Sequence, residues 1–276
     1  MKLDGAIFAI EQRSVGGCID LAIVFVREHL LSMLLLLACF AVPSVILTWW
    51  LVTYVEWTLF ACVLLFAIEC PFFGAALVAA AGHRVFGEPF SVMTGLRSLM
   101  GRFFSLLVLL AFARMVTGVG ALFFLFPSYI LATRYGFLAE ILLLERCRGL
   151  RYESRLSDLL SGLFGHLLGR LVTIFVFFGS CTLSLFMLID LASSTLLGLP
   201  IFTGRISSLE YAVEETLTLL TVDPRVATVL ISVMWLVYPV TRLSWMFCYF
   251  DVRIRKEGWD IELDFRVEAQ RLEASQ

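Results

Sequence analysis

Long apolar runs with few or no charged side chains constrain this sequence more than any other feature. The run from Leu30 to Val55 contains no charged residue, and the run at 57–82 contains only Glu69. About 20 apolar residues form a helix long enough to cross the hydrocarbon core of a bilayer. Because lipid offers the backbone no hydrogen-bond partners, runs of this kind are expected to be helical.

The composition supports a membrane environment. Hydrophobic residues make up 60% of the 276 residues, and charged residues make up only 16%. A soluble domain of this size could not bury so much apolar surface, and the remainder would form large exposed patches. The net charge of −2 gives no indication of nucleic-acid binding. We therefore expect an all-α, polytopic membrane protein.

The apolar runs predict six spanning helices, in a membrane domain at 1–258 that is followed by a cytoplasmic tail at 259–276. The spans are expected at about 30–53, 57–82, 103–126, 128–145, 171–190 and 226–250. The run at 128–145 is the weakest of them, because it is short and contains Arg134 and Glu140. The N-terminus has no signal-peptide pattern, so the first span is expected to remain as an anchor.

The distribution of Lys and Arg predicts the orientation of these spans. Sixteen of them fall on the segments that would lie inside if both termini were cytoplasmic, and two, Arg205 and Arg225, fall on the outer loops. Cytoplasmic loops of membrane proteins carry an excess of Lys and Arg. Both termini are therefore predicted to be cytoplasmic.

A repeated pattern divides the predicted spans into three hairpins. An Arg-x-x-Gly step follows the second, fourth and sixth spans, at Arg84 and Gly87, Arg146 and Gly149, and Arg255 and Gly258. Segments with one apolar and one polar face precede the odd-numbered spans, at 14–30, 91–102 and 154–170. We expect these segments to form amphipathic helices on the inner membrane surface, with their arginines toward the phosphates of membrane lipids.

Two further segments lie outside the predicted spans. The outer loop at about 190–225 is expected to contain a helix at 207–220, capped by Ser207 and Glu210. In the tail, apolar and charged residues alternate from Trp259 to Glu268. This pattern fits either a strand that pairs with a partner's sheet edge or a short helix on the membrane surface.

Four segments of the chain resemble a known membrane domain. They are RSVGGCIDLAIVFVREHLL (13–31), GEPFSVMTGLRSLMGRF (87–103), ILLLERCRG (141–149) and YFDVRIRKEGWDIEL (249–263). They resemble the membrane domain that is fused to glycerophosphodiester phosphodiesterases, and its stand-alone bacterial relatives of unknown function. The resemblance implies an architecture and a location in the bacterial cytoplasmic (inner) membrane. Phosphodiesterase activity is not expected to carry over, because the matching segments exclude the soluble catalytic domain.

Five charged residues within the predicted spans are candidates for a polar site in the membrane: Glu69, Arg114, Arg134, Glu140 and Arg242. Each costs roughly 2.5–3.5 kcal/mol to insert unless it is paired or hydrated. Arg134 and Glu140 are six residues apart, so they cannot pair along one helix, and Glu69 and Arg114 are candidate partners for them. The five charges either pair to hold helices together or line a polar cavity for a solute or a lipid headgroup.

The sequence contains no catalytic, metal-binding or nucleotide-binding motif, so we expect neither an enzyme nor a cofactor. We interpret the chain as a scaffold or subunit of a membrane assembly, whose partners are membrane lipids and other membrane proteins. The alternative is a small transporter or lipid-handling protein. Convergence of the spanning charges on one cleft would favour that alternative, whereas separate pairs between helices would favour the scaffold.

Overall fold

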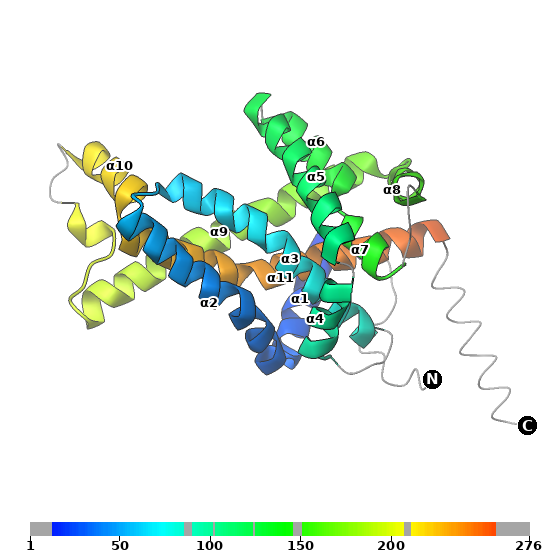
Figure 1. The fold of residues 1–276 in the computed structure, drawn as a ribbon, viewed down its shortest axis with the longest axis horizontal. Helices are drawn as coiled ribbons and strands as arrows, with labels where there is room; N and C mark the ends of the chain where they lie inside the picture. Colours follow the sequence, from blue (N-terminus) through cyan, green and yellow to red (C-terminus); the bar gives the residue numbers. More distant parts are fainter. Residues whose placement is uncertain are drawn as a thin grey trace, which may run out of the picture. The chain divides into compact units, whose positions relative to one another are not determined.

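The computed structural model describes residues 13–85, 90–101, 103–123, 125–145, 151–206 and 211–257. All the regular structure within these residues is helical (Figure 1), which confirms the predicted all-α class. Arg146, the glycines of the three Arg-x-x-Gly steps (Gly87, Gly149 and Gly258) and the tail at 259–276 lie outside the described residues. The form of the tail therefore remains a prediction.

Within the described residues, four helices are long and apolar enough to cross a membrane. They are α2 (Leu30–Tyr54), α3 (Leu59–Val85), α9 (Phe164–Leu196) and α11 (Pro224–Glu257). A fifth candidate is a bent pair, in which α4 (Val92–Gly101) meets the segment Leu106–Thr117 of α5 (Phe103–Phe123) at 84°. The chain therefore has the helices of a multi-pass membrane protein.

The segment at 128–145, which is predicted as one span, is not one continuous helix. It contains the end of α6 (Leu125–Tyr135), a turn, and α7 (Leu138–Leu143). The indole of Trp245, from α11, fills the turn: its Nε1 donates to the carbonyl of Gly136 at 2.9 Å. A Cβ on Gly136 would lie 2.7 Å from the same ring. Glycine is therefore required at the point where the helix breaks.

Helices lie in the three segments that are predicted to precede the odd-numbered spans. They are α1 (Val15–Glu28), α4 and α8 (Arg151–Leu160), and the Ser14 hydroxyl caps α1 by accepting from the amide of Gly17 at 3.2 Å. The third helix is shorter than the predicted 154–170. The chain leaves the helix near Gly162, whose φ of 74° lies in the left-handed region that glycine adopts freely. Residues 164–170 belong instead to α9, which is 33 residues long.

A buried aspartate organises the loop after α9. The carboxylate of Asp190 accepts hydrogen bonds from the amides of Ile201, Phe202 and Thr203 at 3.0, 2.8 and 2.9 Å. These bonds position the short 3₁₀ helix η2 (Thr203–Arg205). The loop backbone therefore gains partners that it would otherwise lack away from water.

In the loop that is predicted to lie outside, the helix α10 (Ala212–Val222) begins later than the predicted 207–220. The expected capping residues, Ser207 and Glu210, lie outside the described residues. Asp223 follows α10 and caps α11 by accepting from the amides of Arg225 and Val226 at 2.8 and 3.2 Å. It also forms an ion pair with Arg205.

The helices pack into two compact units. Unit 1 comprises residues 1–33, 74–174 and 240–276, and unit 2 comprises residues 34–73 and 175–239. In unit 1, α4 packs closely on α3 through Gly95, where a Cβ would lie 2.7 Å from the carbonyl oxygen of Ala76. In unit 2, the rings of Phe66 and Phe73 pack edge-on against Trp235, with centroids 5.1 and 5.6 Å away.

Two glycines of α4 provide a matched test of this packing. Gly95→Ala is expected to lower the free energy of unfolding by about 1–3 kcal/mol, because the new methyl group must displace backbone of α3. Gly101 has no atom within 4 Å of its Cβ position, so Gly101→Ala is expected to leave stability unchanged or slightly raised. Thermal unfolding of the full chain in detergent measures both. Equal stability of the two variants would contradict the close contact.

Candidate functional site

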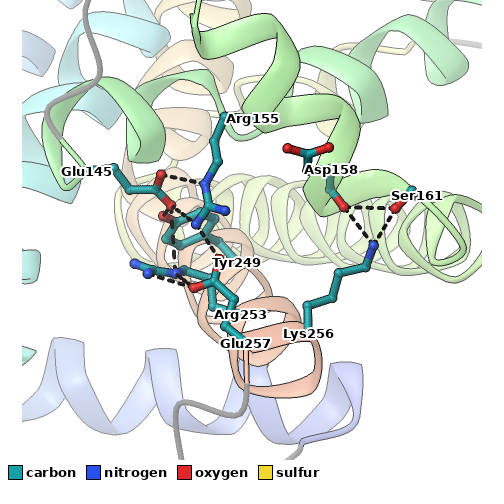
Figure 2. A network of polar contacts seen from close by, with 8 residues as sticks. All are labelled: Glu145, Arg155, Asp158, Ser161, Tyr249, Arg253, Lys256 and Glu257. Atoms are coloured by element: carbon teal, nitrogen blue, oxygen red, sulfur yellow. Dashed lines mark hydrogen bonds and ion pairs between the residues drawn. The ribbon is translucent and has the colours of Figure 1, made fainter. Parts of the chain in front are cut away.

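Charged side chains near the helix ends of unit 1 form a connected network, which Figure 2 shows from close by. Its centre is the carboxylate of Glu145, just after α7. Oε2 and Oε1 of Glu145 accept from Nε and Nη2 of Arg155 at 2.7 and 3.0 Å. The hydroxyl of Tyr249 donates to Oε1 at 2.6 Å. A two-pronged guanidinium–carboxylate pair of this kind fixes orientation as well as distance.

The last turns of α11 join this network. Arg253 and Glu257, four residues apart on α11, form an ion pair at 2.7 Å. Glu257 also pairs with Arg155 of α8, and Arg253 lies 3.7 Å from Glu145. One carboxylate on α11 and one after α7 therefore share the same guanidinium (Figure 2).

A lysine adds a second connection between α11 and α8. Nζ of Lys256 donates to the carbonyl oxygen of Asp158 and to the hydroxyl of Ser161, both at 2.6 Å. These acceptors lie at the end of α8, where carbonyl groups lack partners within the helix. The lysine therefore caps the C-terminal end of α8.

A separate cluster surrounds Asp251, whose side chain is only 2% exposed. Its Oδ2 accepts from Nη1 of Arg170 at 2.6 Å and from Nε of Arg255 at 2.8 Å. Its Oδ1 accepts from the amide of Arg13 at 2.7 Å, and Arg170 also donates to the carbonyl oxygen of Arg13 at 2.9 Å. This carboxylate joins α11, α9 and the residues that lead into α1.

The electrostatics of Glu145 follow from its partners. Burial by itself would raise the pKa of this carboxyl group. The hydrogen bonds from Arg155 and Tyr249 outweigh burial and hold the pKa below its ordinary value. The hydrogen bond to Glu145 likewise raises the pKa of Arg155. Both groups are therefore charged at neutral pH, and the chemistry of the network is that of a structural ion pair.

The structure pairs Glu140 and Arg134 with partners other than the expected candidates, Glu69 and Arg114. Oε1 of Glu140, which is fully buried, accepts from Nη1 of Arg242 at 2.6 Å, and Arg242 is itself only 10% exposed. Arg134 lies 3.5 Å from Glu153, and more than half of each of these two side chains is exposed. One pair is thus buried between α7 and α11, and the other is at the surface.

Glu69 and Arg114 are the other two charges of the predicted spans. Arg114, on α5, is exposed. Glu69 belongs to unit 2, and its Oε2 is buried without a hydrogen-bond partner in the described part of the chain. Of the predicted cytoplasmic junction residues, Arg255 binds Asp251, and Arg84 is partly buried on α3. Within unit 1, the spanning charges Glu140 and Arg134 therefore belong to two separate pairs.

No group of His, Cys, Asp or Glu side chains in the described ranges could hold a metal ion.

No family model, curated protein or solved structure matches this chain. The resemblance to the membrane domain of glycerophosphodiester phosphodiesterases therefore remains a prediction.

Sequence reasoning missed the two acidic residues that organise unit 1, Glu145 and Asp251. A local signal was present for one of them, because Asp251 and Arg255 are four residues apart on one helix, as are Arg253 and Glu257. No such signal exists for Glu145, because Arg155 and Tyr249 are 10 and 104 residues away and are brought to it by the fold.

The pair of Glu140 and Arg242 can be tested by substitution with apolar residues. Arg242→Met leaves a buried carboxylate without its partner and is expected to lower the free energy of unfolding by about 3–5 kcal/mol. The double variant Glu140→Met/Arg242→Met removes both charges and is expected to recover most of that loss. Arg134→Met is the matched control, since an exposed pair contributes about 1 kcal/mol or less. Denaturant unfolding in micelles measures all three. If the double variant is no more stable than Arg242→Met, the interpretation that Glu140 and Arg242 are buried as a pair is contradicted.

The lowered pKa of Glu145 predicts a dependence of stability on pH. A carboxyl group whose pKa is lower in the folded state stabilises the fold above its unfolded pKa of about 4.3, and this contribution is lost as the pH falls toward the folded value. The unfolding free energy of the wild type is therefore expected to fall more steeply than that of Glu145→Gln as the pH is lowered from about 5. Parallel curves for the two proteins would show that Glu145 does not carry this contribution.

Proposed function

We propose that the chain is a non-enzymatic integral membrane protein that acts as a scaffold or subunit of a membrane assembly. The charges described in unit 1 support this proposal, because they join helices to one another in ion pairs. Glu140 is buried against Arg242, and Asp251 is enclosed by Arg170 and Arg255. In this arrangement the charged groups hold the helices in place, as a rigid platform for a partner requires.

The observation that carries the proposal is an exposed face of small residues on α9. Gly165, Gly169 and Thr173 are four residues apart and exposed, so they lie on the same side of the helix. No atom lies within 4 Å of the Cβ position of either glycine. In membranes, small residues at this spacing allow the backbones of two helices to approach closely. We infer that this face receives a spanning helix of a partner protein.

Membrane lipids are the second class of partner in this proposal. Arg27 on α1 and Arg97 on α4 are exposed, and both helices carry a buried apolar face. Such helices suit the membrane interface, where arginine binds lipid phosphate. These two helices and the excess of Lys and Arg on the predicted inner segments support six spans in three hairpins. In this orientation, both termini lie in the cytoplasm, at a bacterial inner membrane. These features also support membership of the resembling membrane-domain family.

Bulky substitutions on α9 test the scaffold. The variant Gly165→Leu/Gly169→Leu is expected to lower recovery of a stoichiometric membrane partner about tenfold, because the new side chains would block close helix approach. The stability of the isolated chain is expected to be unchanged, since the space beside both glycines is open. The measurement is quantitative co-purification of the full chain in mild detergent after cross-linking in membranes.

The matched control is Gly101→Leu, the same substitution at an exposed glycine of α4 with no atom within 4 Å of its Cβ position. This variant is expected to recover the partner at the wild-type level. Purification of the wild-type chain with no stoichiometric protein companion would overturn the scaffold proposal.

The alternative function, a small transporter or lipid-handling protein, is favoured by one observation. Glu69 lies on a spanning helix, and its buried Oε2 has no hydrogen-bond partner in the residues that the structure describes. Ionisable groups at such positions mark pathways for solutes, ions or protons in membrane proteins.

A further inference from the structure

Two carboxyl groups on the helices of this chain have different surroundings: Glu140 is fully buried, and Glu69 is partly buried with one buried oxygen, Oε2. Glu140 lies beside a guanidinium, so its negative charge is compensated within the protein. Within the described residues, the buried Oε2 of Glu69 has no hydrogen-bond partner. The cations of unit 2 are Arg205 and Arg225, and Arg205 is paired with Asp223 in the outer loop.

The second cation of unit 2, Arg225, lies far from Glu69, as contacts with the helix α11 indicate. Phe66 and Phe73 lie three residues before and four residues after Glu69, on the same face of α3. Both rings contact Trp235 of α11, which places Glu69 near the level of that indole. Arg225 is ten residues earlier on the same helix, which corresponds to about 15 Å along its axis.

Aromatic rings make the surroundings of Glu69 apolar. Tyr238 of α11 also packs against Phe66 and Phe73, with centroids 5.8 and 5.9 Å away. Trp235 is 1% exposed, and Phe73 is fully buried. An ionised carboxylate with an oxygen buried in such surroundings is costly without a cation, and such groups take up a proton instead.

The polar groups near Glu69 are neutral. Ser44 of α2 lies beside it, and Thr48 is one turn further along the same face. The oxygens of both hydroxyls are buried and have no hydrogen-bond partner in the described residues, and the same is true of Nε1 of Trp235. Trp235 and Tyr238, on the facing helix α11, are neutral as well. The next cation along this face of α11, Arg242, is four residues after Tyr238 and is paired with Glu140.

We propose that Glu69 is a proton-binding site within the membrane, whose carboxyl group is protonated in the resting protein and exchanges its proton with water. The proton occupies an oxygen that is otherwise without a partner, and the neighbouring hydroxyls can accept or donate in both protonation states. The inference requires neither the protein partner of the scaffold proposal nor a transported solute. It deepens the alternative function by naming its ligand, a proton.

Dicyclohexylcarbodiimide, an apolar reagent that modifies protonated carboxyl groups, provides a test in the intact protein. The acid proton moves to a carbodiimide nitrogen, and the carboxylate oxygen bonds to the central carbon. Transfer of the acyl group to nitrogen then gives a stable acylurea without loss of atoms. Mass spectrometry of peptides from the full chain in lipid vesicles is expected to find Glu69 modified and Glu140 unmodified. The yield at Glu69 should fall as the pH is raised.

Glu69→Gln has the shape of the protonated side chain and is the control variant. It is expected to abolish the modification and to leave the thermal stability of the chain unchanged, whereas Glu140→Gln is expected to destabilise it by leaving Arg242 unpaired. Infrared difference spectra between the wild type and Glu69→Gln report the carboxylic-acid carbonyl band without any reagent, so poor access of the carbodiimide cannot decide the result.

The absence of that carboxylic-acid band at neutral pH would overturn the inference, and so would modification of Glu140 in preference to Glu69. Partner recovery and solute flux are separate measurements. If Glu69 proves not to bind a proton, the scaffold proposal is therefore unaffected. If Glu69 binds a proton but the chain transports no solute, only the transporter function is rejected.

Discussion

The free-energy cost of an uncompensated charge in hydrocarbon is the constraint on which the rest of this structure depends. It explains why the charges described in unit 1 occur in pairs and clusters. Asp251 is almost completely buried, and it is tolerated there because Arg170, Arg255 and the amide of Arg13 surround it. Replacing such a cluster by apolar residues could preserve stability, but only a charged cluster selects one rotation and one register for each helix.

The second half of α11 contacts the segment after α6 along one face of the helix. Arg242, Trp245 and Tyr249 follow one another at spacings of three and four residues, so they occupy one face of the helix. They contact, in turn, Glu140 in α7, the turn at Gly136, and Glu145 after α7. One helix face therefore holds the irregular segment after α6 at three successive levels. A segment too short to span by itself is stabilised in this way.

The spanning helices were predictable because hydropathy is a property of consecutive residues, and α2, α3, α9 and α11 each contain a long apolar run with at most one charged residue. The break within the segment at 128–145 was not predicted, because it depends on an indole that lies more than a hundred residues away in the sequence. The pair of Glu145 and Arg155 was not predicted either, because a separation of 10 residues is not one that brings two side chains together along one helix. In contrast, the pair of Asp251 and Arg255 was visible as a helical spacing, although its role as a junction with α1 and α9 was not.

The length and rotation of α9 connect the charged cluster to the proposed partner surface. A helix of 33 residues extends about 50 Å, well beyond the hydrocarbon core of about 30 Å, so part of it must reach the interface. Arg170 directs one side of α9 toward Asp251. Gly165 and Gly169 lie on a different side, which is exposed. The ion pair therefore fixes the rotation of the helix and keeps its small residues directed outward. A partner helix would meet a surface that needs no rearrangement before binding, and preorganisation of this kind lowers the entropy cost of association.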